Sequence, residues 1–262
     1  MTTPSRTPPP ANTATPTIPL SETTAPNIPT PLPTLDVEEA AKIIDDFSYS
    51  NGGCRLPCWW GLPMGTATLE EANQLLSPLA LASYRIVQVD TQKQVIQLTH
   101  MLPWEEEFRY WPTSILFIDK KMVELQTLPN RNLSLAQLMN EYGPPGEIWV
   151  KTTPYPLSDV LISMRLLFPQ QGIFIGFSEL ATEQAEGQGI FVKPCFTIPI
   201  GIVLWWTELN YNFKNLEPSF SDANLVDKFL PMREAAGMDV DEFYEIYKDA
   251  EGPACIEINL EN

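Results

Sequence analysis

The first 34 residues constrain this chain most, because they offer almost nothing that a protein core can bury. Ten of them are proline, ten are threonine, and the only charged residues are Arg6 and Glu22. Proline fixes φ and removes a backbone donor, so such a segment favours open polyproline conformations. From Leu35 onward the chain turns to tryptophan, cysteine and aliphatic runs. We therefore expect a disordered Thr/Pro-rich stalk over residues 1–35, followed by a folded head.

Length and charge narrow the class of the head. The 262-residue chain is 44% hydrophobic, which suits one larger domain or two small ones with a sizeable core. Its net charge of −17 includes no cluster of lysine and arginine. Because phosphate binding depends on such clusters, we expect no nucleic-acid partner.

The sequence contains neither a membrane span nor a signal peptide. The most apolar run, 196–206, contains Pro199 and Gly201 and is shorter than the roughly 18 residues that a span needs. Met1 to Pro4 has no basic or apolar leader. The protein is then either cytoplasmic or an exported protein whose signal has been trimmed. A Thr/Pro stalk favours the second, with contact to a membrane only through an N-terminal anchor missing from this sequence.

Four cysteines, Cys54, Cys58, Cys195 and Cys255, allow three disulfide connectivities. Glycine and proline around the first two permit a local bridge, and the other two stand at expected strand starts. We favour Cys54–Cys58 and Cys195–Cys255. A four-thiolate zinc site is the alternative, but its usual two close pairs are not present, since the second pair lies 60 residues apart. A redox pair normally has two intervening residues instead of three.

The order of expected elements suggests two similar modules. Helices are expected at 36–47 and 68–76, where Thr68 and Glu71 form a capping-box pattern. Strands follow at 83–89, 95–101, 111–118 and 122–128. A helix at 132–142 and strands at 147–151, 157–169 and 172–177 repeat this order. We infer an α+β fold of tandem helix-plus-antiparallel-sheet modules packed into one head.

The expected domains are the stalk, a first module over 36–130, a second over 131–190 and a C-terminal strand–helix–strand segment over 191–262. Residues 179–189 are acidic and glycine-containing and are expected to form an exposed loop. The run 196–206 is expected as a buried strand. Asp239 and Glu242 form a capping box for a helix over 239–248, and 255–260 is expected as a last strand.

Two motifs resemble a known superfamily. Gly61-Leu-Pro-Met-Gly65-Thr66-x-Thr68-x-x-Glu71-Ala, together with the helix that ends Glu-Tyr-Gly-Pro-Pro145, resembles the modules of β-lactamase-inhibitor-protein-like proteins and of small outer-membrane-assembly lipoproteins. The Cys-x3-Cys-Trp-Trp-Gly run also resembles uncharacterised envelope lipoproteins of the Chloroflexota. The resemblance covers residues 61–177, and Ser77-Pro78-Leu79 departs from its pattern. It implies protein–protein binding through a sheet face, and it implies no catalytic residues.

Residues that could carry catalysis are few. His100 is the only histidine, so a multi-histidine metal site cannot form, and a structural role is expected. Glu105, Glu106 and Glu107 follow Trp104, but neighbouring residues of a strand point to opposite faces and cannot jointly flank one glycosidic bond. We therefore predict no catalytic residue, no metal ligand and no cofactor.

Tryptophans are the remaining candidates for binding. Trp59, Trp60, Trp104, Trp111, Trp205 and Trp206 form a possible aromatic binding surface, because an exposed indole can anchor a protein or stack on a sugar. Core packing is the alternative for most of them. The sequence thus favours a non-enzymatic binding or scaffold protein at the bacterial cell envelope, whose partner is an unknown protein or glycan. A carbohydrate-binding or glycan-hydrolysing protein is the alternative.

Overall fold

The computed structural model describes residues 35–79, 83–104, 107–127, 133–155, 159–186, 189–197, 199–216, 228–250 and 255–260. For 101–104, 107–111, 155, 185–186 and 189–190 it describes the backbone alone. The predicted stalk lies outside the described residues, apart from Leu35. The described residues belong to one compact unit.

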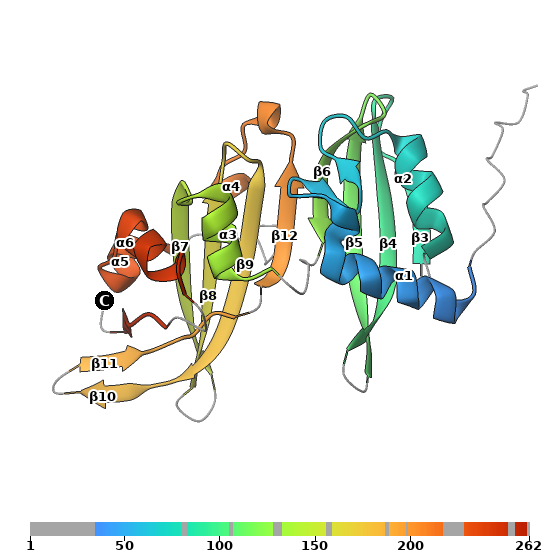
Figure 1. The fold of residues 1–262 in the computed structure, drawn as a ribbon. Coiled ribbons are helices and arrows are strands. Elements are labelled where there is room, and N and C mark those ends of the chain that lie inside the picture. Colours follow the sequence, from blue (N-terminus) through green and yellow to red (C-terminus); the bar gives the residue numbers. More distant parts are fainter. Residues whose placement is uncertain are drawn as a thin grey trace, which may run out of the picture. The chain divides into compact units, whose positions relative to one another are not determined.

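The protein has an α+β fold in which helices cover a large antiparallel sheet (Figure 1). The helices are α1 Val37–Ser50, α2 Leu69–Leu76, α3 Leu135–Tyr142, α4 Phe213–Leu216, α5 Met232–Ala236 and α6 Val240–Tyr247. The strands of the large sheet are β3 Ser83–Gln88, β4 Lys93–Trp104, β5 Glu107–Ile118, β6 Lys121–Thr127, β7 Glu147–Tyr155, β8 Asp159–Phe168, β9 Ile173–Thr182, β12 Pro199–Trp205 and β13 Leu230–Pro231. Two small sheets contain β1 Cys58–Trp59 with β2 Leu62–Pro63, and β10 Gln184–Glu186 with β11 Gly189–Val192 and β14 Ile258–Asn259.

Local sequence signals account for the helix starts. Thr68 caps α2 and Asp239 caps α6, and each forms the expected capping box with a glutamate three residues on. Ser134 caps α3 with Gln137 in the same arrangement. Gly143, with φ 76°, then ends α3, as its place before two prolines predicts. These predicted helices are confirmed, with boundaries that differ by a few residues.

The nine strands follow the order β13-β7-β8-β9-β12-β6-β5-β4-β3. Two meanders, β3 to β6 and β7 to β9 with β12, therefore join where β12 pairs with β6. The register at this junction places Val203 opposite Gln126 and Leu204 opposite Leu125. The buried strand predicted near 196–206 is confirmed, and it lies at the centre of the sheet. The predicted domain boundaries stay predictions.

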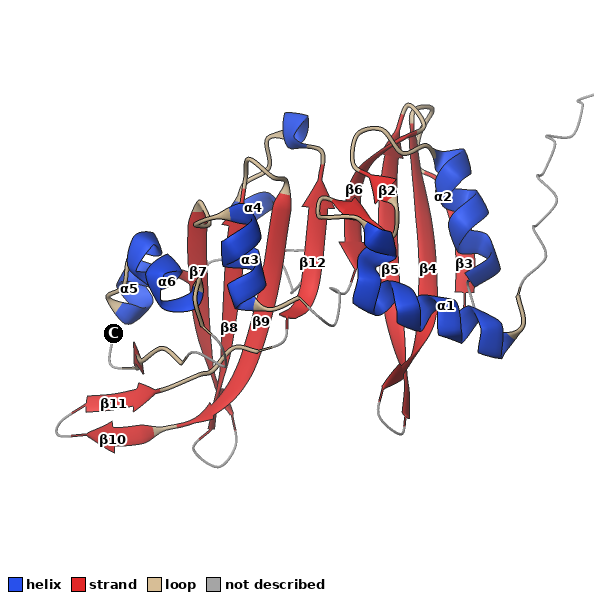
Figure 2. Ribbon diagram, viewed as in Figure 1, coloured by secondary structure: helices blue, strands red, loops and turns tan. Residues whose placement is uncertain are grey.

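One hydrophobic core runs along the helix-covered face of both meanders. On successive strands Ile96, Ile115, Leu125, Leu204 and Ile173 lie side by side in the register, and all are buried. Helices α1, α2 and α3 pack on this face (Figure 2), and their buried residues belong to the same core. The alternation of buried and less buried residues along β6 is the period-two pattern of a half-covered sheet.

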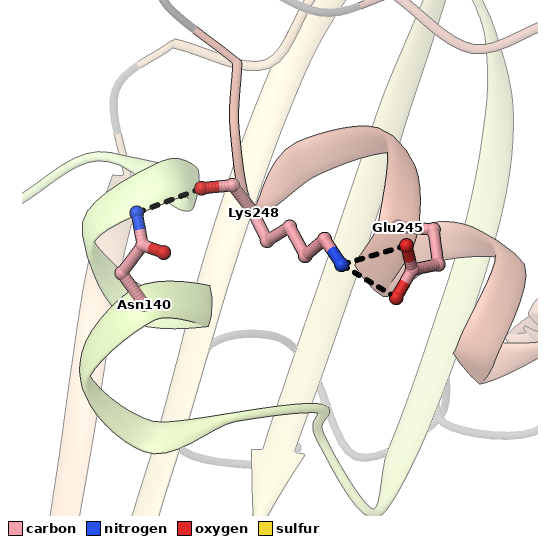
Figure 3. Close-up of polar contacts among 3 residues, drawn as sticks. All are labelled: Asn140, Glu245 and Lys248. Carbon is pink, nitrogen blue, oxygen red and sulfur yellow. Dashed lines mark hydrogen bonds and ion pairs between the residues drawn. The ribbon is translucent and has the colours of Figure 1, made fainter.

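The C-terminal helix α6 is attached to α3 by polar contacts (Figure 3). The side-chain amide of Asn140 donates to the backbone carbonyl of Lys248 at 2.7 Å. The ammonium of Lys248 lies 2.7 Å from the carboxylate of Glu245, one turn back on α6. The bond from Asn140 to Lys248 joins residues 108 positions apart and fixes the end of α6 against α3.

One prediction about the second half was wrong. Most of the described residues of 179–189 form strands instead of an exposed loop, since β9 continues to Thr182 and Gln184–Glu186 pair with the strand that begins at Gly189. The backbone pairing of β11 with β14 extends this pair into a three-stranded sheet. Acidic and glycine residues suggested a loop, but pairing with the distant C-terminal segment favours strands here.

Candidate functional site

The candidate site is the sheet face that points away from α1, α2 and α3. Side chains alternate between the two faces of a strand, so every second residue of β3, β4, β5 and β6 points to this second face. The pairing register places one such residue from each strand in a single cross-strand row. That row consists of Arg85, Gln97, Ser114, Gln126, Val203, Phe174 and Leu167.

The half of this face over β7, β8, β9 and β12 is covered by the chain itself. A second hydrophobic cluster consists of Leu167, Phe174, Val203, Trp205, Phe213, Leu216 and Phe229. The rings of Trp149 and Phe213 stack with centroids 4.4 Å apart, so α4 is packed directly on the sheet. The guanidinium of Arg165 lies 5.2 Å from the ring centre of Phe229, a cation–π distance.

The half over β3 to β6 is not covered by the described residues of other elements and contains a pocket of about 530 Å³. We call this half the open face. Its lining comes from four adjacent strands: Ser83, Tyr84, Arg85, Gln97, Leu98, Thr99, Pro112, Thr113, Ser114 and Gln126. Tyr84, Leu98 and Thr113 alternate with the outward-facing residues. Leu98 and Thr113 are buried, and the Tyr84 hydroxyl donates to Asn73 of α2 at 2.7 Å. Because ligand pockets commonly measure 300–1,000 Å³, this volume suits a small group or a few side chains.

The pocket floor is polar, and cross-strand hydrogen bonds order it. Nε of Arg85 donates to Oε1 of Gln97 at 2.7 Å. The hydroxyl of Ser83 donates to that of Thr99 at 3.0 Å. Each of these bonds joins two residues that lie opposite each other on β3 and β4. The bonds therefore restrict the side chains of both pairs to one orientation.

A half-buried carboxyl marks the boundary between the covered and open halves. Glu124 lies opposite Trp205 in the register, and its carboxylate accepts a hydrogen bond from the hydroxyl of Tyr211 at 2.8 Å. Burial raises the pKa of Glu124, while the bond from Tyr211 lowers it by a smaller amount. The pKa of Tyr211 is also raised, by burial and by the neighbouring charge of Glu124. The hydrogen bond between Tyr211 and Glu124 thus attaches the segment after β12 to β6, where the covered half ends.

The predicted aromatic surface is largely buried, which corrects that interpretation for three residues. Trp59, Trp60 and Trp205 are 5%, 8% and 1% exposed, so they pack in the interior. Trp59 and Trp60 stack with centroids 4.1 Å apart, and Trp60 also contacts Phe47 of α1. Trp206 is half-buried. Trp104 and Trp111 lie in β4 and β5, and their side chains are outside the description.

Both predicted disulfides are present, Cys54–Cys58 and Cys195–Cys255. All four cysteines are therefore bridged, and the alternative of a thiolate zinc site does not apply. The first bridge closes the loop before β1, and the second attaches the segment before β14 to the segment before β12. Disulfides of this kind are typical of proteins that fold in an oxidising compartment.

His100 has the structural role expected of it. It is 2% exposed, and its ring lies 4.9 Å from that of Trp60, on the helix-covered face. Neither ring nitrogen has a hydrogen-bond partner among the described residues. Burial lowers the pKa of His100 from 6.5 to about 4, so the ring is neutral at physiological pH.

The pocket residues were not among the sites predicted from the sequence. Arg85, Gln97, Thr99, Ser114 and Gln126 each occupy an ordinary outward position of an amphipathic strand. The only available signal was that their alternation with apolar residues leaves one face polar. That they gather in one place follows from the pairing register, which the sequence pattern does not specify.

Comparisons with known proteins do not place the chain in a family. No protein-family model, curated protein or solved structure matches the chain. Among the described helices, none combines the length and the apolar character that crossing a membrane requires.

Proposed function

We propose that this protein is a non-enzymatic binding module that is tethered at the cell envelope and binds a partner protein through its open sheet face. One observation carries the proposal: aromatic residues of the chain cover the β7–β12 half of this face, whereas none of the described residues outside β3–β6 lines the pocket on the other half. An open sheet face with a pocket of about 530 Å³ suits the docking of side chains from another protein.

The proposed location rests on separate observations. Two disulfides support an oxidising, extracytoplasmic compartment. The Thr/Pro-rich composition of residues 1–34 supports a spacer between this head and a membrane anchor. The resemblance to envelope modules that bind proteins through a sheet supports the same function. The glycan alternative gains no such support, because Trp59, Trp60 and Trp205 are buried.

Site-specific photo-crosslinking of the full chain tests the proposed function. A crosslinking residue placed at Ser83 or Val87 samples the open face, and one at Glu70 or Glu245 samples helices on the other side of the sheet. With an envelope fraction of the producing cells, we expect one protein adduct shared by the first two positions and missing from the other two. The adduct is identified by mass spectrometry, and the identified protein is purified.

Direct binding then decides the proposal. Ser114→Trp fills the pocket, whereas Gln74→Trp places the same side chain on the exposed surface of α2. We expect the first variant to weaken binding of the purified partner at least about tenfold and the second to leave it unchanged. Equal adducts from both faces, or equal binding by both tryptophan variants, contradicts the proposal. Binding to a glycan array in place of a protein supports the carbohydrate alternative.

A further inference from the structure

The open pocket differs in charge from the rest of the molecule. The chain has 33 acidic and 16 basic residues, so a surface chosen at random is expected to contain carboxylates. Yet the described lining contains one cation, Arg85, and no aspartate or glutamate. The chain as a whole has a net charge of −17, whereas the pocket lining is positively charged, so the pocket suits a negatively charged group.

The hydrogen-bond donors of the pocket point to the same kind of ligand. Nε of Arg85 is occupied by Gln97, which leaves the two terminal nitrogens of the guanidinium as a parallel pair of donors. Gln97 uses its oxygen in this bond, so its amide nitrogen remains a donor. Thr99 accepts from Ser83, and its own hydroxyl proton is then available. A ligand for this site must bring acceptors.

A carboxylate satisfies this arrangement better than other anions do. Its two oxygens match the planar donor pair of an arginine, in the bidentate geometry common to arginine–carboxylate pairs. The Arg85–Gln97 bond holds the guanidinium in place, which reduces the side-chain entropy lost on binding. Phosphate sites usually gather several cations or a helix N-terminus, and the described lining has a single cation on strands.

Apolar residues next to the pocket indicate what carries the carboxylate. Val87, Val95 and Leu116 begin the adjacent cross-strand row on the same face, and Val87 is 36% exposed. The row continues to Glu124, whose carboxyl is held by the hydroxyl of Tyr211. Side chains two residues apart on an extended segment point the same way and lie about 7 Å apart, which matches the spacing between these rows. An extended segment can therefore place an acidic residue over Arg85 and an apolar residue over the valines.

We propose that the pocket binds the carboxylate of an aspartate or glutamate on an extended segment of the partner protein. An apolar side chain two residues away on that segment would then contact Val87, Val95 and Leu116. This inference rests on the proposed function and names the partner's chemistry. It assigns Arg85 the role of recognising the charge. Gln97 holds Arg85 in position, and Thr99 adds a neutral donor.

NMR titration of the full chain with two capped peptides tests the inference. The probes are acetyl-Val-Ala-Glu-Ala-Val-amide, in which both valines lie two residues from the glutamate, and the same peptide with glutamine in place of glutamate, each added up to about 5 mM. We expect the glutamate peptide to shift the side-chain signals of Arg85 and Gln97 and the backbone signals of β3 and β4. The glutamine peptide is expected to bind at least about tenfold more weakly, since it lacks the charge.

Two arginine variants provide the matched comparison. Arg85→Gln removes the pocket cation, and Arg233→Gln removes an exposed cation on α5. We expect the first to abolish the preference for glutamate and the second to preserve it, with both variants folded as judged by their spectra. Equal shifts with both peptides, no shift with either, or equal effects of both variants overturns the inference.

The two experiments fail independently. One outcome is that crosslinking and partner binding support the open face while the glutamate and glutamine peptides bind equally. In that case the proposed protein-binding function is supported and the proposed carboxylate recognition is wrong. If the glutamate peptide binds at Arg85 but no partner docks on the face, the proposed function is wrong and the pocket takes free carboxylates. Sodium acetate, added alone as a further probe, separates a small carboxylate from a peptide segment.

Discussion

The side-chain amide of Asn51 accepts a hydrogen bond from the backbone nitrogen of Trp60 at 3.0 Å, nine residues further along the chain. Its amide nitrogen also donates to the carbonyl oxygens of Cys54 and Cys58, both at 2.9 Å. One buried side chain thus organises the disulfide loop and positions Trp60 against Phe47 and His100.

Asn51→Ala is expected to destabilise the protein by about 3 kcal/mol beyond the cost of placing alanine in the left-handed region, because one buried and two part-buried backbone groups lose their partner. Asn210→Ala is the control: Asn210 also has φ 53° but is exposed. Urea unfolding of both variants measures the difference. Equal losses would show that the hydrogen bonds of Asn51 contribute little.

Two glycines have almost the same φ but different surroundings. Replacing each by alanine therefore compares the cost of backbone strain alone with the cost of strain plus a steric clash. Gly172 has φ 67° and Gly237 has φ 68°. A Cβ at Gly172 would overlap the backbone carbonyl of Trp205, which belongs to the central strand β12, whereas at Gly237 it would meet open space. Gly172 also accepts a hydrogen bond from the backbone nitrogen of Trp205 at 2.9 Å.

Gly237→Ala is therefore expected to cost about 1 kcal/mol, the ordinary penalty for alanine at positive φ. Gly172→Ala is expected to cost at least about 3 kcal/mol, since the sheet backbone must shift as well. Thermal and urea unfolding of the two variants provide the comparison. A similar loss in both would mean that the β9–β12 pairing adjusts without strain.

Local signals in the sequence were sufficient to predict several elements, and distant pairings were not. Thr68 with Glu71 and Asp239 with Glu242 are capping boxes that depend on residues three apart, so the sequence alone identified those helix starts. The disulfide pairing followed from the glycine and proline around Cys54 and Cys58 and from the expected strand starts near Cys195 and Cys255. In contrast, Val203 lies opposite Gln126 through a pairing of segments about 77 residues apart, which no local pattern specifies.

The candidate site was missed for the same reason. Arg85, Gln97 and Ser114 come from three strands, and each is an unremarkable polar residue of an amphipathic strand. Only the register brings them into one row. The tryptophans were predicted to form a binding surface because of their residue type. Trp59 and Trp205 are buried instead, because large aromatic side chains gain most from packing.

Stability should depend on pH through His100. Its pKa is about 4 in the folded protein and 6.5 as an ordinary histidine, so the unfolded chain binds the proton more readily. Stability contributed by the neutral ring is fully present above pH 6.5, and it is lost as pH falls toward 4, by up to about 3 kcal/mol.

His100→Phe removes this titration and keeps an aromatic ring beside Trp60. We expect the variant to lose less stability than the natural protein between pH 7 and pH 4.5, as measured by urea unfolding at both pH values. Because the chain has one histidine, its proton NMR signal also reports the pKa directly. A histidine signal that titrates near pH 6.5 in the folded protein contradicts the prediction.

The two disulfides should differ in their contribution to stability because they close loops of different length. Cys195 and Cys255 are 60 positions apart, and Cys54 and Cys58 are 4 apart. In the chain-entropy description, a bridge restricts the unfolded chain more strongly when its loop is longer, which gives about 4 kcal/mol for the long loop and about 2 kcal/mol for the short one. The long bridge also joins the segment before β14 to the segment before β12, so its loss should loosen the pairing of β11 with β14.

Replacing each pair by serines gives matched variants for this comparison. We expect Cys195→Ser/Cys255→Ser to lower the free energy of unfolding about twice as much as Cys54→Ser/Cys58→Ser, with faster amide hydrogen exchange in β11 and β14 for the first variant alone. If the short-loop variant is the less stable of the two, packing around Trp59 and Trp60 outweighs loop entropy, because that bridge lies beside their stacked rings.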